Sequence, residues 1–289
     1  MRPPDGAEYP HVLRGTASWR SILGIALAVV ALLVVPALIS QAVLTGAGPD
    51  ADLARGAEAF DLPVGLLAVN LGTAALALVA WLLVAGLHRV QPAWSSSVRP
   101  GMRWRYLLVC VPVAVIVLVG GQLLASSGVG WAPQPGFAAF LLVILLTSPL
   151  QALGEELIFR GYLLQAFGSL ASRAWLGPVA AAVVFALFHG VQNPALFVDR
   201  LLLGLIAGVL VWQTGGLEAA VVAHAVGNVA TYTLAGATTS VAAVRAVDGI
   251  GWAAAAFDVA GLAVFAVVAV LVARRMGLRT RVEPALARV

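Results

Sequence analysis

Long apolar segments separated by short polar connections dominate this sequence. Most of them approach the roughly 20 residues that an α-helix needs to cross the hydrocarbon core of a membrane. The first is too long for the apolar core of a cleaved signal peptide. We therefore predict an all-α, polytopic membrane protein with about eight transmembrane helices, at approximately 22–44, 63–87, 106–124, 137–167, 174–189, 196–212, 217–234 and 252–272.

Composition supports this fold class. Hydrophobic residues make up 61% of the 289 residues and charged residues only 10%, whereas soluble domains carry about 25% charged residues. The basic residues are spread over several loops without interleaved aromatic residues, so nothing indicates nucleic-acid binding. Without a long-period repeat or a separate soluble segment, residues 1–289 are expected to form a single integral membrane domain.

The arginines predict the orientation, because cytoplasmic loops of membrane proteins carry an excess of basic residues. One set of alternate loops carries only Arg55, Arg200 and Arg245. We expect a multi-pass protein of the cell membrane with both termini in the cytoplasm, which an even number of spans allows. The loops on the predicted cytoplasmic side carry thirteen arginines: Arg2, Arg14, Arg20, Arg89, Arg99, Arg103, Arg105, Arg173, Arg274, Arg275, Arg279, Arg281 and Arg288.

Several polar positions outside the charged centre receive structural interpretations. Residues 46–62 are rich in Asp, Glu, Gly and Pro and are expected to form an acidic loop, and 190–194 is expected to end a helix. Asn70 lies within a span, where an interhelical hydrogen bond is expected. His88 follows a span beside Arg89, which predicts a solvated position at the membrane edge.

The fourth span contains the most unusual polar group, Glu155, Glu156 and Arg160. A charge at the centre of a membrane helix costs roughly 2.5–3.5 kcal/mol on insertion scales. Glu156 and Arg160 are four residues apart and share a helix face, so we expect them to pair. Glu155 is turned by about 100°, which leaves it available for chemistry such as general base catalysis. The alternative is a structural ion cluster that holds helices together.

Two further spans carry His189, and His224 with Asn228 four residues later. Either histidine alone would suit an interhelical hydrogen bond. Together with the charged group of the fourth span, they predict a shared polar interior, because lipid exposure of each would be costly. A carboxylate base, two imidazoles and an amide donor are the groups needed to hydrolyse an amide bond.

Three motifs in this order, Glu155-Glu156-xxx-Arg160, Phe185-xxx-His189 and His224-xxx-Asn228, resemble those of the CPBP family. That family includes type II CAAX prenyl endopeptidases and bacterial proteins related to bacteriocin processing and immunity. The similar core covers approximately residues 137–235.

The resemblance implies an eight-helix intramembrane endopeptidase whose site opens to the cytoplasm. Glu155 would activate the attacking water with help from His189, while Glu156 and Arg160 would orient the site. The substrate would be a membrane-associated protein or peptide, with lipidated proteins among those that fit.

The same resemblance assigns stabilisation of the oxyanion to His224 and Asn228. A catalytic zinc ion is a further option, because two histidines and one glutamate with an open position are a known zinc set. The spacing differs from the HExxH pattern of soluble zinc proteases. Water activated by Glu155 without metal would use the same residues, so the sequence leaves this question open.

Two other functions compete with proteolysis. A non-catalytic binding or bacteriocin-immunity protein could retain these residues for packing. A proton-coupled carrier also uses intramembrane Glu, His and Arg, but it is expected to show pseudo-repeats in both halves, and here the polar groups gather in one half.

The predicted boundaries raise one conflict of depth. At 1.5 Å per residue, Glu155 and His189 lie roughly 20 Å from the cytoplasmic ends of their helices, and His224 only about 10 Å. Either the fourth and fifth helices project into the cytoplasm, or the predicted boundaries are displaced by a turn or more.

Overall fold

A computed structural model describes residues 1–48, 51–126, 128–190 and 193–284. Asp50, Val191, Gln192 and Arg288, which entered the loop and charge predictions, lie outside the described residues. The α-helices are α1 Ser18–Ala47, α2 Ala51–Glu58, α3 Pro63–Ala74, α4 Leu76–Leu82, α5 Trp104–Ala114, α6 Gly120–Ala125, α7 Phe137–Glu156, α8 Leu164–Leu170, α9 Leu176–Phe188, α10 Pro194–Thr214, α11 Glu218–Thr238, α12 Val241–Arg245 and α13 Trp252–Arg275.

Three π-helical turns join some of these helices into longer ones. Leu83–Leu87 continues α4, Val115–Val119 joins α5 to α6, and Leu157–Leu163 joins α7 to α8. In the described ranges, β-structure is limited to two isolated bridges. The all-α class predicted from the sequence is therefore confirmed.

Each predicted span corresponds to a helical segment. Within the described residues, six helices are long and apolar enough to cross a membrane, and α9 is a shorter apolar helix of 13 residues. The 21-residue α11 is long enough but more polar, because it carries His224 and Asn228. This is the pattern of a polytopic membrane protein, in which the least apolar of the long helices lies at the predicted site.

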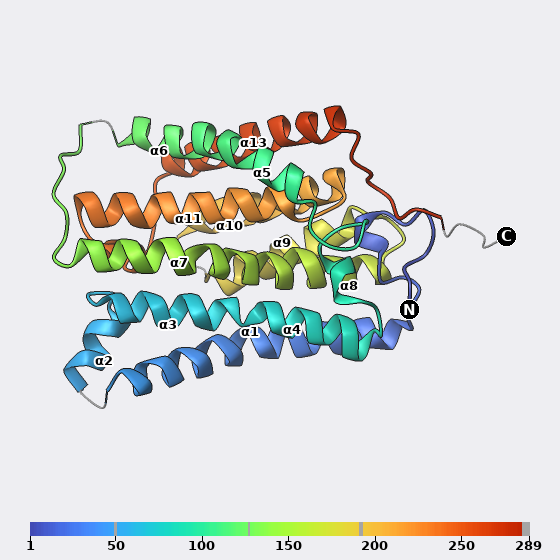
Figure 1. The fold of residues 1–289 in the computed structure, drawn as a ribbon, viewed down its shortest axis with the longest axis horizontal. Helices are drawn as coiled ribbons and strands as arrows, with labels where there is room; N and C mark the ends of the chain where they lie inside the picture. The colour runs from blue at the N-terminus through green and yellow to red at the C-terminus, as the bar shows by residue number, and fades with distance from the viewer. Residues whose placement is uncertain (49–50, 127, 191–192, 285–289) are drawn as a thin grey trace.

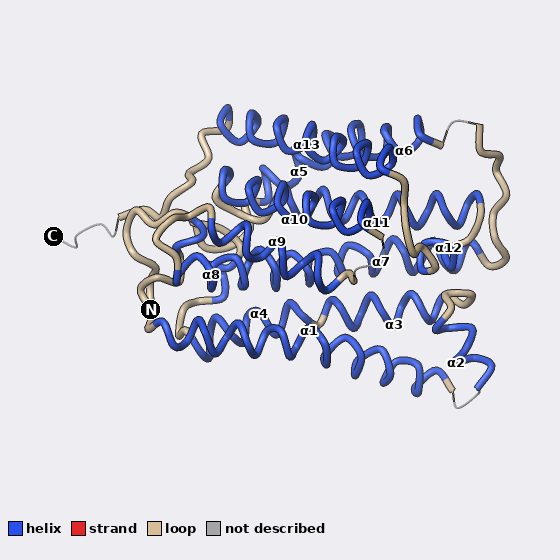
Figure 2. The backbone as a smooth tube through the Cα atoms, turned by 180° about the vertical axis from the view of Figure 1, so that it is seen from behind, coloured by secondary structure: helices blue, strands red, loops and turns tan. Residues whose placement is uncertain are grey.

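The helices lie in three layers (Figures 1 and 2). Helices α1, α3 and α4 form one outer layer, and α5, α6 and α13 form the other. The middle layer contains α7, α9, α10 and α11, and the three motifs lie on α7 and the turn after it, at the end of α9, and on α11. The predicted site therefore lies between two layers of helices that carry none of its motifs.

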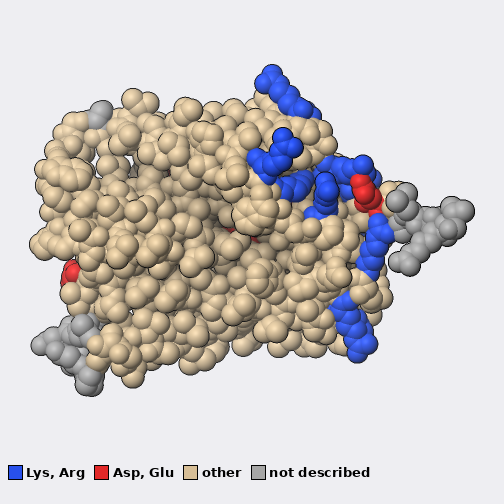
Figure 3. All heavy atoms as spheres, in the orientation of Figure 1, with Lys and Arg blue, Asp and Glu red and all other residues tan. Residues whose placement is uncertain are grey.

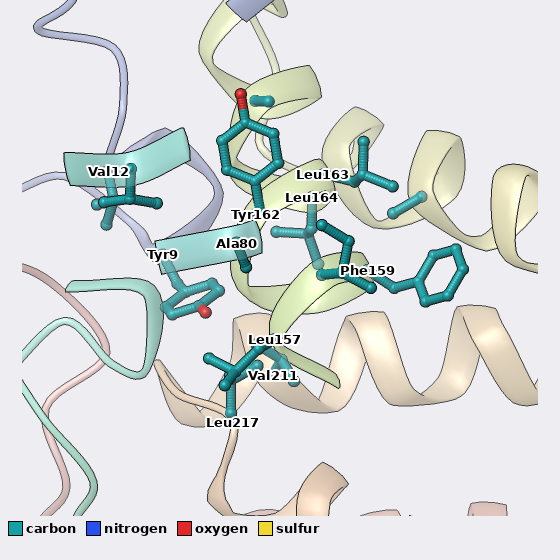
Figure 4. Close-up of a cluster of buried hydrophobic side chains, with 14 of the residues drawn as sticks. Tyr9, Val12, Ala80, Leu157, Phe159, Tyr162, Leu163, Leu164, Val211 and Leu217 are labelled. Atoms are coloured by element: carbon teal, nitrogen blue, oxygen red, sulfur yellow. The ribbon is translucent and has the colours of Figure 1, made fainter. Parts of the chain in front are cut away.

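A cluster of buried apolar side chains surrounds the π-helical turn Leu157–Leu163 (Figure 4). Every residue of this turn is buried. Tyr9 and Leu13, from the segment before α1, pack into the same cluster and are fully buried. The N-terminal segment thus packs against the helix that carries the first motif.

Two sequence interpretations were wrong. Residues 51–58 form the helix α2 rather than an acidic loop, because this stretch is rich in alanine and contains no proline. His88 is fully buried rather than solvated, because the N-terminal segment covers it. Its Nδ1 lies 3.0 Å from Thr16 Oγ1 and its Nε2 3.1 Å from Tyr162 Oη.

The interpretation of Asn70 is confirmed. Its amide nitrogen donates across α3 and α7 to Thr147 Oγ1 at 2.7 Å and to Ser148 Oγ at 3.2 Å. A buried side-chain amide with hydrogen-bonded partners holds two helices together without exposing a polar group to lipid.

The long fourth helix accounts for the depth conflict. The continuous segment Phe137–Leu170 has 34 residues, or about 51 Å at 1.5 Å per residue, well beyond a hydrocarbon core of about 30 Å. Glu155 precedes the end of α8 by 15 residues, and His224 follows the start of α11 by six. Because Glu155 and His224 are in contact, the fourth helix extends roughly 13 Å further on that side than α11 does.

On the face seen in Figure 3, the basic side chains gather at one end. The N-terminus and the last described residues, up to 284, lie at this same end (Figure 1). The grouping is the one expected from the alternation of arginine-rich loops, and the cytoplasmic location of this end remains a prediction from the positive-inside rule.

Candidate active site

The first motif occupies the end of α7, where the helix packs unusually close to α3. A Cβ atom at Gly154 would lie 2.4 Å from the carbonyl oxygen of Thr73, so only glycine allows this approach. The π-helical turn begins at Leu157, directly after Glu156. Such turns insert one extra residue into a helix and are frequent at functional sites. The regular α-helix assumed from the sequence therefore ends within the motif.

Glu156 forms the buried centre of the site. Its Oε1 atom accepts hydrogen bonds from Arg160 at 2.8 Å and from His224 Nδ1 at 2.9 Å. The side chains of Glu156 and Arg160 are only 2% and 4% exposed, which confirms the predicted pair. Because the carboxylate accepts the Nδ1 proton of His224, it also fixes the orientation of the imidazole ring.

Glu155 lies on a more accessible face. Its side chain is 14% exposed, and its Oε2 atom lies 3.5 Å from Nε2 of His224. Its other oxygen, Oε1, accepts a hydrogen bond of 2.6 Å from the side-chain amide of Gln151. The two adjacent glutamates thus contact opposite nitrogens of one histidine, although only Glu156 pairs with the arginine.

Asn228 joins the site through Gln151, a residue that the sequence analysis missed. The Asn228 amide nitrogen donates to Gln151 Oε1 at 2.7 Å. The spacing of four residues between Gln151 and Glu155 was a signal that could have found it, because residues four apart share a helix face.

His189 lies at the end of α9, where its Nδ1 donates to the carbonyl oxygen of Phe185 at 2.8 Å. This bond leaves the lone pair of a neutral ring on Nε2. The Phe185 ring contacts both His189 and Arg160: its centroid lies 4.3 Å from that of the His189 ring and 4.4 Å from the Arg160 guanidinium. Arg160 therefore links the first two motifs.

The residues offer limited support for a metal centre. In the described part of the chain, no three His, Cys, Asp or Glu side chains are arranged to hold a metal ion. His224 uses Nδ1 for Glu156, and His189 uses Nδ1 for Phe185. Metal-bound histidines commonly make bonds of this kind through the ring nitrogen that does not bind the metal, so the zinc ion stays a prediction.

Residues 137–230 match the protein family described as type II CAAX prenyl endopeptidase Rce1-like. The match contains all three motifs and supports the resemblance to the CPBP family. At the level of the family, it points to a CAAX-type intramembrane protease.

A relative from Bacillus subtilis (strain 168), described as uncharacterized protein YyaK, is 32% identical over 98 residues. The similar segment covers 32% of this chain and 33% of the relative, so the two proteins are alike over about a third of their lengths. No solved structure matches the chain significantly.

Proposed function

We propose that this protein is an intramembrane endopeptidase that hydrolyses a peptide bond of a membrane-associated protein or peptide. The observation that carries the proposal is the contact network around His224, in which Glu155 and Glu156 lie against opposite ring nitrogens. This network places one accessible carboxylate beside an imidazole that a second, buried carboxylate orients. The family match at residues 137–230 supports the same reaction class.

In the proposed reaction, Glu155 accepts a proton from water, and the resulting hydroxide attacks the substrate carbonyl carbon. Glu155 suits this role because its side chain is 14% exposed, whereas Glu156 is 2% exposed and bonded to Arg160. His189 would assist the activation of this water, the role that the resemblance to the family implies for it. The proton on Glu155 then passes to the leaving amine, so that hydrolysis consumes one water.

The oxyanion formed by this attack needs hydrogen-bond donors. We assign them to Asn228, through its amide nitrogen, and to His224, through Nε2 of its imidazolium form. Glu156 supports that form because it accepts the proton on Nδ1. An oxyanion donor of this kind contributes roughly 3–4 kcal/mol to transition-state stabilisation.

The substrate is expected on the cytoplasmic side. The site lies nearer to the end of α11 that is at the arginine-rich end of the molecule than to the other end of this helix. His224 is the seventh residue of this 21-residue helix. Membrane-anchored proteins and lipidated peptides are the substrate classes that reach such a position.

Proteomics of membrane-protein termini tests the proposal without a known substrate. A wild-type strain should contain new termini that a Glu155→Ala strain lacks, and a synthetic peptide spanning such a terminus should be cleaved by the purified wild-type protein. Identical termini in both strains would instead favour the non-catalytic binding or immunity protein. A proton-coupled carrier would leave termini unchanged and acidify vesicles on substrate uptake.

A further inference from the structure

The side-chain amide of Gln151 connects two helices of the candidate site. Gln151 lies on α7, one turn before Glu155, and its nitrogen donates to Glu155 Oε1 at 2.6 Å. Its oxygen accepts from the Asn228 amide on α11 at 2.7 Å. One amide group therefore contacts both the proposed base and the proposed oxyanion donor.

The chemistry of these groups fixes the direction of both bonds. An ionised carboxylate only accepts hydrogen bonds, so Gln151 must turn its NH₂ group to Glu155. The Gln151 oxygen then faces Asn228, and Asn228 must turn its own NH₂ group toward it. The amide orientation of Asn228 is thus determined by Glu155, through Gln151.

This orientation matters for the proposed reaction. An Asn NH₂ group carries two N–H bonds, and Gln151 accepts one of them, which leaves the second for a substrate oxygen. If Asn228 turned its amide by 180°, it would present an oxygen that repels an oxyanion. The same contact holds Glu155 in place, because Oε1 is bound by Gln151 while Oε2 faces His224 at 3.5 Å.

We propose that Gln151 is a positioning residue of this site, which orients the Asn228 amide toward the reacting carbonyl and holds the Glu155 carboxylate. The inference rests on the proposed function. Its role is distinct from that of Asn70, whose amide joins α3 to α7 one turn earlier without contacting any motif residue.

A double-mutant cycle tests this proposal with the peptide identified from the termini comparison. Gln151→Met keeps the side-chain length but removes both hydrogen bonds, and we expect kcat to fall by about 10²-fold with KM changed much less. Asn228→Ala should lower kcat by about 10²–10³-fold. The part of this loss that acts through Asn228 should be absent from the double variant, which should therefore be much less than 10²-fold slower than Asn228→Ala alone.

Thr147→Val is the matched structural control, because it removes a hydrogen bond between α3 and α7 outside the motifs. It should lower thermal stability and leave kcat and KM unchanged. A second variant, Gln151→Glu, keeps an acceptor for Asn228, but it loses the donor to Glu155 and places a second carboxylate beside it. Its remaining activity should still fall when Asn228→Ala is added, and this result would support the proposal if Gln151→Met failed to fold.

Three outcomes would contradict either the proposed function or the role of Gln151. If Glu155→Gln retains wild-type turnover, the proposed function fails and the role of Gln151 fails with it. If Glu155→Gln is inactive while Gln151→Met has wild-type kcat, only the role of Gln151 fails. If the losses from Gln151→Met and Asn228→Ala multiply in the double variant, Gln151 does not act through Asn228.

Discussion

The Nδ1 atom of His224 lies 2.9 Å from Oε1 of Glu156, although 68 positions separate the two residues in the chain. The same oxygen binds Arg160 at 2.8 Å. Glu156 therefore joins α7 to α11, as Gln151 does through Asn228, whereas Glu155 beside it contacts the accessible edge of His224. Two adjacent residues of one type thus have different contacts.

This difference predicts different effects of the same substitution. Glu156→Gln leaves the buried Arg160 without its ion-pair partner and should lower the free energy of unfolding by roughly 3–5 kcal/mol. Glu155→Gln should abolish turnover and leave thermal stability near that of the wild type. Thermal unfolding in detergent and the peptide assay measure both effects, and equal melting temperatures for the two variants would contradict the assignment.

A second buried ion pair fixes the start of α11. Glu218 is fully buried, and its two carboxylate oxygens accept from Arg103 at 2.8 and 2.6 Å. We expect Arg103→Ala to destabilise the protein by roughly 3–5 kcal/mol, because it leaves a buried carboxylate unpaired. Arg281→Ala is the control, since its pair with Glu8 is largely exposed and should contribute less than about 1 kcal/mol. Similar losses in the two variants would exclude this role for Glu218.

His88 predicts a dependence of stability on pH. Burial, with a smaller effect of Arg20, lowers the pKa of His88 from 6.5 to about 4. The unfolded chain therefore binds a proton at higher pH than the folded protein does. The stability that neutral His88 supports is complete above pH 6.5, and it should decrease as the pH falls toward 4, by up to roughly 3 kcal/mol.

Thermal unfolding of the wild type and of His88→Gln between pH 7.5 and 4.5 measures this effect. The variant should lose the His88-dependent part of the decrease and retain the part due to other groups. Parallel curves for the two proteins would show that His88 does not titrate in this way.

The arginine distribution predicts which residues face the cytoplasm. In a Cys110→Ala background, single cysteines at Arg99 and Arg279 should react with a membrane-impermeant reagent only from the cytoplasmic side. A cysteine at Glu58 should react only from the opposite side. All three positions are exposed, so accessibility does not limit labelling. Cytoplasmic labelling at Glu58 would reverse the orientation or change the number of spans.

The metal question has a direct test. We expect chelator to leave peptide cleavage unchanged, because the described side chains do not form a three-ligand set and the proposed reaction activates water through Glu155. Elemental analysis of active protein should then find no stoichiometric metal. A stoichiometric metal that is lost from a His189→Ala His224→Ala variant, with affinity decreasing below about pH 6.5, would establish a metalloprotease.

The sequence alone determined the fold class and much of the polar centre. Apolar runs long enough to cross a membrane require helices, because hydrocarbon offers backbone groups no other hydrogen-bond partner. The pair of Glu156 and Arg160 followed from the four-residue spacing within one helix. The cost of lipid-exposed charge predicted that His224 would face the same interior.

Only the tertiary structure decided which nitrogen of His224 meets which glutamate, and that Gln151 joins Glu155 to Asn228. It also buried His88 under the N-terminal segment and placed a π-helical turn directly after Glu156. Helical periodicity specifies which residues of one helix share a face. It does not specify the rotation and depth of one helix against another, because these depend on close packing such as that of Gly154 against Thr73.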